Sequence, residues 1–440
     1  MSASDKFLKS TPHQFIEFLK NQNIFRFYFA YEPSSKKMRS SHPQLEPIAQ
    51  FIAADNRDFR QHEGLFFQIT KRFDTLKGAF IHQTKRGQAL GGFRYWQYET
   101  LEDYIRDGLR LSKGMTRKNA LAGLWWGGGK GVMAENPHID KNDPEIRKYL
   151  FQEYGAFISS LKGCYITAED VGTHVDDMAQ IFSRTRFAIC IPEEWGGSGN
   201  PSVPTARGVV AGMEAALEFL NLGNLQGKTI VVQGIGNVGG PLINFLFEKK
   251  VKKVIGADIS PELIEKRKKE FSGKPLELRL IEKKDYSLFR EECDIFSPCA
   301  TGAVLNPATI PLLKTKIVCG SANNQLEDSN RDGRALINAN IVYVPDFLTN
   351  RMGVVNAANE QYGYVKNDPL IEQHLQKTWK HSIHQTTLRV LTESRSTGEP
   401  TAKIAIETAD DLSHEPHPLF GHRGQQIIES LISEQWHKAL

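Results

Sequence analysis

The sequence lacks a large excess of charge of either sign. It carries 55 Lys and Arg against 51 Asp and Glu, a net charge of +4 over 440 residues. Such a balance gives no indication of a nucleic-acid partner, although it would not repel an anionic ligand. The hydrophobic share of 40% is ordinary for a folded globular protein. The length predicts two domains, the minimum needed to form a cleft between them.

Paired cysteines and long apolar runs are also missing. The five cysteines are an odd number without C-x-x-C spacing, which favours reduced thiols over a disulfide framework. No 18 consecutive apolar residues indicate a membrane span. The first residues include an early acidic side chain and no apolar segment typical of a signal peptide. We therefore expect a cytoplasmic protein without a membrane partner.

Secondary-structure signals divide the chain into a leading segment and two regimes. Residues 1–50 indicate an extension that ends in a polar loop around Ser34-Ser35-Lys36-Lys37. Alternating apolar residues over 65–94 predict strands, and Asp143-Pro144 is a typical helix start. From about residue 205, short β-branched runs alternate with helical segments, which predicts βαβ units and a parallel sheet.

The sequence thus predicts an α/β fold of two domains. We expect an N-terminal α/β substrate domain over 51–203 and a Rossmann-type, doubly wound dinucleotide-binding domain over 204–379. The long helices of about 380–440 are expected to pack back on the first domain.

A glycine-rich turn follows the apolar run at 229–233 and has the spacing G-x-G-x-x-G. Its glycines permit a tight turn, a close approach to a pyrophosphate, and close packing of the next helix, whose N-terminus favours phosphates. Asp258 lies 19 residues after the third glycine, where a carboxylate can accept hydrogen bonds from a ribose. A turn in an unrelated α/β protein is the alternative. The predicted dinucleotide site comprises Gly234, Gly236, Asn237, Val238, Gly239 and Asp258.

The same carboxylate bears on the identity of the dinucleotide. Asp258 would repel a 2′-phosphate, which favours NAD over NADP. The cluster Lys266-Arg267-Lys268-Lys269 argues the other way, but Glu262, Glu265 and Glu270 alternate with it, as is typical of a solvated helix face. We therefore expect NAD as the cofactor.

Three segments of the first domain combine glycines with charged side chains: Leu90 to Arg94, Gly114 to Ala120, and Gly127 to Gly131. Glycine runs let the backbone approach a ligand. Two lysines, Lys118 and Lys130, lie 12 residues apart in these segments. On the residues alone they could be ordinary surface lysines. A phosphate loop is excluded because the pattern G-x-x-x-x-G-K-[ST] is absent.

In these segments the chain resembles the glutamate/leucine/phenylalanine/valine dehydrogenase family, and most closely its leucine and phenylalanine dehydrogenases. The matching segments, in family order, are ALGGFR, GMTRKNA, GGGKGV, YITAEDVGT, SGNPSVPTARGV, QGIGNVG, CGSANNQL and PDFLTNRMGVVNAANEQYG. The resemblance implies a homo-oligomeric enzyme in which the first domain holds an amino acid and the second holds the dinucleotide, with a cleft that closes for hydride transfer.

The resemblance also implies roles for individual residues. Lys130 would be the catalytic lysine that activates water, and Asp170 would exchange a proton with the substrate amino group. A helix N-cap is the alternative for Asp170. Lys118 would bind the α-carboxylate, and its charge together with a dry cleft would lower the pKa of Lys130. The other implied contacts are Leu90, Gly91, Met115, Ala168 and Val354 in the substrate pocket, Asn323 at the carboxylate, and Thr205 and Asn350 near the nicotinamide.

The residue before Gly91 indicates the substrate class. Family members that act on glutamate carry a lysine there, whereas this chain has Leu90. A buried glutamate side chain would lack its charge partner, so an apolar L-amino acid of the leucine, valine or isoleucine type is favoured. The implied products are a 2-oxo acid and ammonia, and no metal is required. A glutamate or phenylalanine dehydrogenase, or a NAD-binding scaffold without turnover, are the alternatives.

The chain departs from the family pattern at three places. Trp125 and Trp126 precede the glycine run where leucine enzymes carry smaller residues, and packing is the favoured role for both. Arg351 places a cation beside the expected nicotinamide position, where the family has a small residue. The N-terminal segment is longer than in the family.

Overall fold

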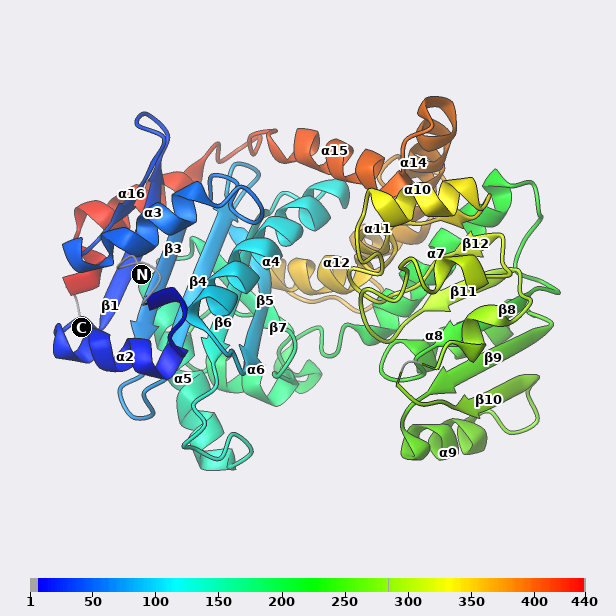
Figure 1. Cartoon of the computed structure of the whole chain (residues 1–440), viewed down its shortest axis with the longest axis horizontal. Coiled ribbons are helices and arrows are strands. Elements are labelled where there is room, and N and C mark those ends of the chain that lie inside the picture. The colour runs from blue at the N-terminus through cyan, green and yellow to red at the C-terminus, as the bar shows by residue number, and fades with distance from the viewer. Residues whose placement is uncertain (1–6, 284, 439–440) are drawn as a thin grey trace. The chain divides into compact units, whose positions relative to one another are not determined.

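The computed structural model describes residues 7–283 and 285–438, and these residues form two compact units (Figure 1). Unit 1 comprises residues 1–199, 357–364 and 410–440, and unit 2 comprises residues 200–356 and 365–409. No helix in the described ranges is both long and apolar enough to cross a membrane.

Unit 1 contains a mixed sheet of seven strands among the described residues, in the order β2-β1-β3-β4-β6-β5-β7. Its strands are β1 (Arg26–Glu32), β2 (Lys37–Ser40), β3 (Gly64–Ile69), β4 (Leu76–Gln83), β5 (Ala89–Trp96), β6 (Gly127–Ala134) and β7 (Tyr165–Glu169). Strand β5 pairs in parallel with both β6 and β7, and the other pairings are antiparallel. The carboxyl ends of β5, β6 and β7 therefore meet at one edge of the sheet.

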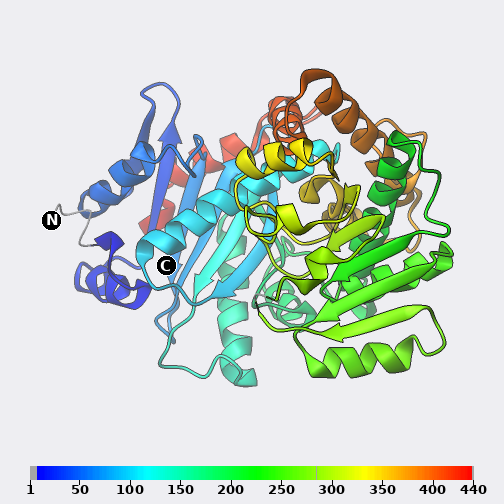
Figure 2. The same ribbon diagram turned by 45° about the vertical axis from the view of Figure 1, so that its right-hand side comes forward.

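The helices of unit 1 cover this sheet. They are α2 (Pro12–Asn21), α3 (Glu46–Ala54), α4 (Leu101–Leu121), α5 (Pro144–Ser160), α6 (Val175–Phe182) and α16 (Arg423–Ser433). Helix α4, cyan in Figure 2, lies against β4 and β6. The predicted helix at Asp143-Pro144 is confirmed as α5. The side chain of Asp143 accepts hydrogen bonds from the backbone N–H groups of Glu145 and Ile146 and so caps the helix.

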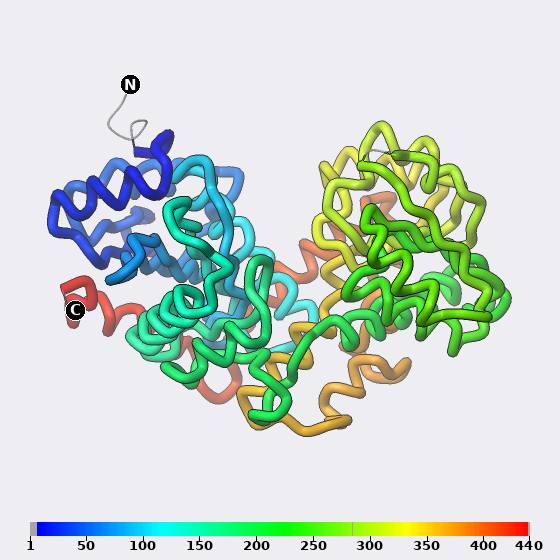
Figure 3. Tube along the Cα trace, turned by 90° about the horizontal axis from the view of Figure 1, so that it is seen from below, coloured from blue at the N-terminus to red at the C-terminus, as the bar shows by residue number. Residues whose placement is uncertain are grey.

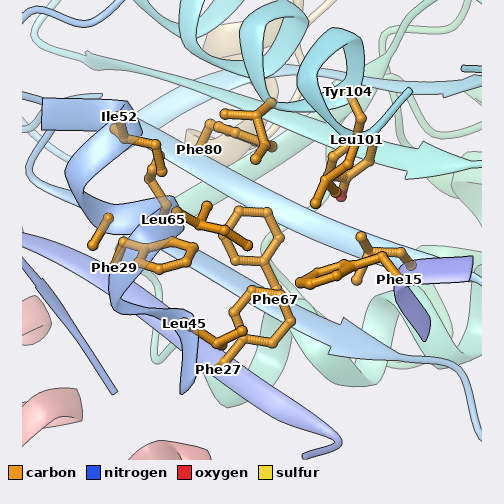
Figure 4. Close-up of a cluster of buried hydrophobic side chains, with 14 of the residues drawn as sticks. Phe15, Phe27, Phe29, Leu45, Ile52, Leu65, Phe67, Phe80, Leu101 and Tyr104 are labelled. Carbon is orange, nitrogen blue, oxygen red and sulfur yellow. The ribbon is translucent and has the colours of Figure 1, made fainter. Parts of the chain in front are cut away.

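The N-terminal segment is part of the first sheet, so the prediction of an extension over 1–50 is wrong. Strand β1 pairs with β3, and Phe27 stacks on Phe67 at a centroid distance of 4.7 Å within a buried aromatic and aliphatic core (Figure 4). The predicted polar loop is the hairpin turn between β1 and β2, because Glu32 pairs with Lys37. The first six residues lie outside the described residues. The alternating aromatic residues of β1 supply the apolar face that the sheet buries.

Unit 2 contains a parallel sheet of six strands among the described residues, in the order β10-β9-β8-β11-β12-β13. The strands are β8 (Thr229–Gln233), β9 (Lys253–Asp258), β10 (Leu276–Leu280), β11 (Ile295–Pro298), β12 (Ile317–Val318) and β13 (Val342–Tyr343). The order reverses between β8 and β11, and such a switch point is where doubly wound sheets bind ligands. This arrangement confirms the predicted Rossmann-type fold.

The other α-helices begin in unit 2, and two of them, α12 and α15, end in unit 1. They are α7 (Ser202–Phe219), α8 (Gly239–Glu248), α9 (Pro261–Glu270), α10 (Arg331–Asn338), α11 (Asp346–Thr349), α12 (Met352–Asn359), α13 (Pro369–Glu372), α14 (Ile383–Thr397) and α15 (Thr401–Ser413).

The predicted domain boundaries need two corrections at this end. Residues 357–364, expected in the second domain, belong to unit 1. Residues 365–409 belong to unit 2, where α14 packs on α7 and Leu391 joins the core. After residue 409 the chain returns to unit 1, and its last two residues lie outside the described residues. This red segment lies beside the blue N-terminal strands (Figure 3), and Trp436 contacts the Phe66 ring at 5.3 Å. Continuous helical periodicity hid the change of unit.

Candidate active site

The side chains that pack against β6 explain why the residues around Lys130 are glycines. A Cβ at Gly129 would lie 2.7 Å from the Tyr165 ring, and one at Gly128 would overlap the Thr116 side chain. Only the lysine of this run carries a side chain longer than hydrogen before Val132. Strand β6 therefore presents one functional group at this point, a lysine whose residue is 3% exposed.

Lys130 meets Asp170, which follows the end of β7. The Lys130 Nζ lies 2.8 Å from the Asp170 Oδ2. A Cβ at Gly92 would lie 2.7 Å from the Asp170 Cβ and 3.2 Å from the Lys130 Nζ, so glycine keeps this space open. Asp170 is not a helix N-cap, because α6 begins after His174. The structure thus brings the two predicted catalytic residues together.

Burial and charge set the proton affinities of this pair. Burial lowers the pKa of Lys130, the Arg94 guanidinium lowers it further, and the Asp170 carboxylate opposes both effects. Burial alone would raise the pKa of Asp170, but Lys130 and Arg94 together hold it below its usual value. Arg94 is therefore one cation that acts on Lys130, and the sequence analysis did not predict it.

Arg94 and Asp107 belong to the site and were not predicted. The Arg94 Nε donates to the Asp170 Oδ2 at 3.1 Å, and its Nη1 donates to both oxygens of Asp107 at 3.2 and 2.9 Å. Arg94 ends the LGGFR segment, which was a signal that could have been used. Asp107 gave no signal, because its position in the middle of α4 is ordinary for a solvated acid.

Next to this charged group lie the predicted substrate-pocket residues of unit 1. Leu90 is fully buried, and a Cβ at Gly91 would lie 3.0 Å from the Met115 Cγ. Ala168 pairs with Gly92 in the sheet. Lys118 lies three residues after Met115 on α4, and this spacing places both side chains on one face of the helix. Lys118 is partly buried.

Asn119 is a further missed residue that supports this region. It is fully buried, and its Nδ2 donates to the carbonyl oxygens of Leu90 at 3.3 Å and Gly127 at 2.6 Å. It therefore ties α4 to the starts of β5 and β6.

The two tryptophans act as packing residues. The Arg86 guanidinium lies 4.2 Å from the centroid of the Trp125 ring, and Trp126 is 6% exposed and contacts Tyr362.

In unit 2 the predicted dinucleotide loop joins β8 to α8, with Asn237 and Val238 leading into the helix at Gly239. Gly234 has a φ of +89°, a conformation that favours glycine. A Cβ at Gly239 would overlap the Gly234 carbonyl oxygen, whereas nothing lies within 4 Å of one at Gly236. Gly234 thus fits a tight turn, Gly239 fits close packing of the helix, and Gly236 leaves an open face for a phosphate.

Asp258 ends β9 beside this loop. Its Oδ2 accepts a hydrogen bond from the Ile235 N–H at 3.0 Å, and its Oδ1 accepts one from the Ser260 N–H at 3.1 Å. The interpretation of 266–269 as a solvated helix face is wrong for Arg267, which is 7% exposed. Its guanidinium donates to the carbonyls of Ile235 and Gly236 at 2.9 Å each and so braces the loop.

The remaining predicted residues also lie in unit 2. The Asn350 Nδ2 donates to the Asn323 Oδ1 at 2.7 Å, while the Asn350 Oδ1 is buried and has no hydrogen-bond partner among the described residues. A Cβ at Gly353 would lie 2.7 Å from the Thr205 Oγ1, and Val354 follows on α12. A buried, unused amide oxygen fits a ligand that brings an N–H donor, such as the carboxamide of a nicotinamide.

Arg351, which the sequence placed beside the expected nicotinamide position, is a buried residue. Its residue is 0% exposed, its guanidinium donates to the His381 carbonyl, and burial together with Arg389 lowers its pKa to about 9. The side chain is therefore held inside unit 2. Among the described residues, no group of three or more His, Cys, Asp or Glu side chains could hold a metal ion.

Comparisons with known proteins agree with this geometry. Residues 68–187 match the model of the Glu/Leu/Phe/Val dehydrogenase, dimerisation domain, and residues 196–409 match that of Glutamate/Leucine/Phenylalanine/Valine dehydrogenase. The chain belongs to the Glu/Leu/Phe/Val dehydrogenase family. It is thus an amino-acid dehydrogenase, an oxidoreductase acting on CH–NH2 donors, as the sequence predicted. Dehydrogenases of this family depend on NAD or NADP.

Relatives with different amino-acid substrates resemble this family member. Leucine dehydrogenase from Bacillus cereus is 42% identical over 332 residues, which cover 75% of this chain and 85% of that protein. Phenylalanine dehydrogenase from Lysinibacillus sphaericus is 37% identical over 293 residues, covering 66% and 74%. The crystal structure of L-tryptophan dehydrogenase from Nostoc punctiforme matches with a TM-score of 0.64 and 32% identity, covering 80% and 96%.

Proposed function

We propose that this enzyme oxidatively deaminates an apolar L-amino acid of the leucine, valine or isoleucine type with NAD, forming a 2-oxo acid and ammonia. The observation that carries the proposal is the pair of the buried Lys130 and the partly buried Asp170, 2.8 Å apart, beside the side-chain-free space at Gly92. A general base and a proton-exchanging carboxylate within hydrogen-bond distance are what deamination requires.

In the proposed reaction the side chains of unit 1 divide the work. Lys118 binds the α-carboxylate, and Asp170 accepts a proton from the substrate ammonium group. The dinucleotide, when bound, supplies the oxidant that takes the Cα hydrogen with its electron pair. Lys130 then removes a proton from the water that attacks the imine carbon, and Asp170 returns a proton to the departing ammonia. The lowered pKa of Lys130 favours its role as the base.

The walls beside the catalytic pair support an apolar substrate. Leu90 is 0% exposed, and Met115 lies next to Gly91. A glutamate side chain placed against Leu90 would lose water without gaining a cation at that position, which costs several kcal/mol. An apolar side chain has no such cost, and its burial contributes about 1.5–3 kcal/mol.

Features of unit 2 support NAD. The Asp258 carboxylate stands at the end of β9, where it would accept from a ribose hydroxyl and repel a 2′-phosphate. Arg267, the cation nearest the loop, is engaged with two loop carbonyls and with Glu270. We propose that Gly236, Asn237 and Val238 face the pyrophosphate. Thr205 and the free Asn350 Oδ1 would face the nicotinamide.

A homo-oligomer in a reducing, cytoplasmic environment is part of the proposal. The family model that matches residues 68–187 is named for dimerisation. The five cysteines are free thiols, as is common in reducing compartments.

The test is a substrate and coenzyme panel. Purified enzyme is incubated with NAD or NADP and each of L-leucine, L-valine, L-isoleucine, L-phenylalanine, L-tryptophan and L-glutamate, and the reduced coenzyme is followed by absorbance. We expect the highest kcat/KM with NAD and a branched-chain substrate. A preference for glutamate, for an aromatic substrate or for NADP would overturn the corresponding part of the proposal.

A further inference from the structure

The chain places a second cation against the proposed proton-exchanging carboxylate. The Asp170 Oδ2 receives both the Lys130 ammonium at 2.8 Å and the Arg94 Nε at 3.1 Å. One carboxylate oxygen therefore serves two cations. Because Lys130 must lose its proton to act as a base, Arg94 is the cation that stays with Asp170 at that stage.

Arg94 is itself held in place by a carboxylate on another element. Its Nη1 donates to both oxygens of Asp107 on α4, and Asp107 also accepts from the Tyr98 hydroxyl at 2.8 Å and from the Arg110 Nη2 at 2.7 Å. The Asp107 side chain is 9% exposed. This arrangement fixes the guanidinium plane, so that Nε points at Asp170 while Nη1 is occupied.

We propose that Arg94 is a positioning residue that keeps Asp170 ionised and aimed at the substrate amino group, and that Asp107 anchors Arg94 for this purpose. The inference deepens the proposed deamination and rests on it. Among the described residues Arg94 is hydrogen-bonded to Asp170 and no hydrogen bond joins it to Lys130, so its direct contact with the catalytic pair is with Asp170.

The charged and titratable groups that act on Asp170 come from the neighbouring strands. They are Lys130 on β6, Arg94 on β5, and Glu169 and Tyr165 on β7, while Asp107 on α4 pairs with Arg94. Burial together with the charges of Asp170 and Asp177 raises the pKa of Glu169 to about 7. Glu169 and Lys130 are therefore the neighbours in this set whose own titrations contribute to the same pH profile as that of Asp170.

Removal of Arg94 shifts the pKa values of both catalytic groups in the same direction. Without its positive charge, Asp170 holds its proton to higher pH, and Lys130 also holds its proton to higher pH because a repelling cation is gone. Deamination needs both groups unprotonated. The acid limb of kcat/KM therefore moves to higher pH.

The chain offers a matched control for this experiment. Arg110 pairs with the same Asp107, but its side chain is 58% exposed, against 20% for Arg94, and no contact with Asp170 is recorded among the described residues. Arg94→Gln and Arg110→Gln each remove one cation from Asp107, and only the first removes a contact to Asp170.

The pH dependence of kcat/KM is measured at saturating NAD for the wild type, Arg94→Gln, Arg94→Lys and Arg110→Gln. We expect the acid limb of Arg94→Gln to move up by about one pH unit or more, roughly a tenfold loss of rate on that limb with recovery above it. Arg94→Lys should restore most of the limb, and Arg110→Gln should leave it unchanged. A Glu169→Gln background that keeps the shift excludes Glu169 as its source.

Two kinetic results would overturn the inference: an equal loss of rate at every pH in Arg94→Gln, or the same shift in Arg110→Gln. A second readout separates this inference from the proposed function. The Asp170 carboxyl signal of ¹³C-aspartate-labelled protein, assigned with Asp170→Asn, should titrate at higher pH in Arg94→Gln. If the wild type turns over no amino acid while this midpoint moves, the proposed function fails and the positioning role stands. An unmoved midpoint overturns the positioning role.

Discussion

The predicted substrate region of unit 1 and the dinucleotide loop of unit 2 differ in the kind of group on which each depends. The first depends on charged side chains, Lys130, Asp170 and Arg94, held in a partly buried corner by glycines and by Asp107. The second depends on backbone shape, with Gly234 in a left-handed turn and Gly239 packed against its carbonyl. Side-chain changes in unit 1 should therefore alter rate and pH dependence, whereas backbone changes in unit 2 should alter coenzyme binding.

The largest effect is expected for Lys130→Ala. Loss of the base should lower kcat by about 10²- to 10⁴-fold, because general base catalysis contributes that much. The Kd for NAD, measured by protein fluorescence quenching, should stay within twofold, since unit 2 is untouched. Lys113→Ala, on the partly exposed face of α4, serves as the control lysine. Near-native turnover in Lys130→Ala would remove Lys130 from the mechanism.

Two alanine substitutions in the loop sharpen the contrast. Gly236→Ala meets no protein atom within 4 Å and should leave the melting temperature unchanged, while weakening NAD by about 10- to 100-fold because the backbone no longer approaches the pyrophosphate. Gly239→Ala overlaps the Gly234 carbonyl and should lower both NAD affinity and the melting temperature. Unchanged NAD affinity in Gly236→Ala would contradict the assignment of that face.

Leu90→Lys tests the substrate wall. The new ammonium would stand at a fully buried position, where a glutamate side chain could pair with it. The ratio of kcat/KM for glutamate over leucine should rise about tenfold or more. The free energy of unfolding, measured with urea, should fall by about 2–4 kcal/mol, whereas the control Leu90→Met should cost less than about 1.5 kcal/mol. An unchanged ratio would place the substrate side chain elsewhere.

The smallest effect is expected for Asp258→Asn. Removing one negative charge near the 2′-position should lower the NAD-over-NADP ratio of kcat/KM about tenfold, equivalent to about 1.4 kcal/mol. Glu265→Gln, which removes an exposed carboxylate of α9 that pairs with Lys268, is the control and should leave the ratio unchanged. If both variants behave alike, Asp258 does not select the coenzyme.

Local sequence signals predicted the elements whose geometry is local. The G-x-G-x-x-G turn, the start of α5 at Asp143-Pro144 and the parallel strands of unit 2 each depend on neighbouring residues, and the structure contains them. The glycine-lysine segment was equally visible, because glycines are needed wherever β6 meets the Tyr165 ring and α4.

Features that depend on tertiary pairing were missed. Arg94 and Asp107 stand on different elements and meet only after α4 folds over the sheet. In the sequence, Arg267 stands among lysines that are typical of a solvated helix face. Its hydrogen bonds to the loop carbonyls form only when the helix packs beside the loop. The strands of the first fifty residues were overlooked because a polar hairpin turn was interpreted as a linker.

Product analysis tests the central claim most directly. Wild-type enzyme is incubated with L-leucine and NAD, and NADH, ammonia and 4-methyl-2-oxopentanoate are each quantified over time. The proposed deamination predicts that the three products form in equal amounts, and that all three form about 10²- to 10⁴-fold more slowly with Lys130→Ala. NAD binding without any of these products, or NADH without ammonia, would contradict it.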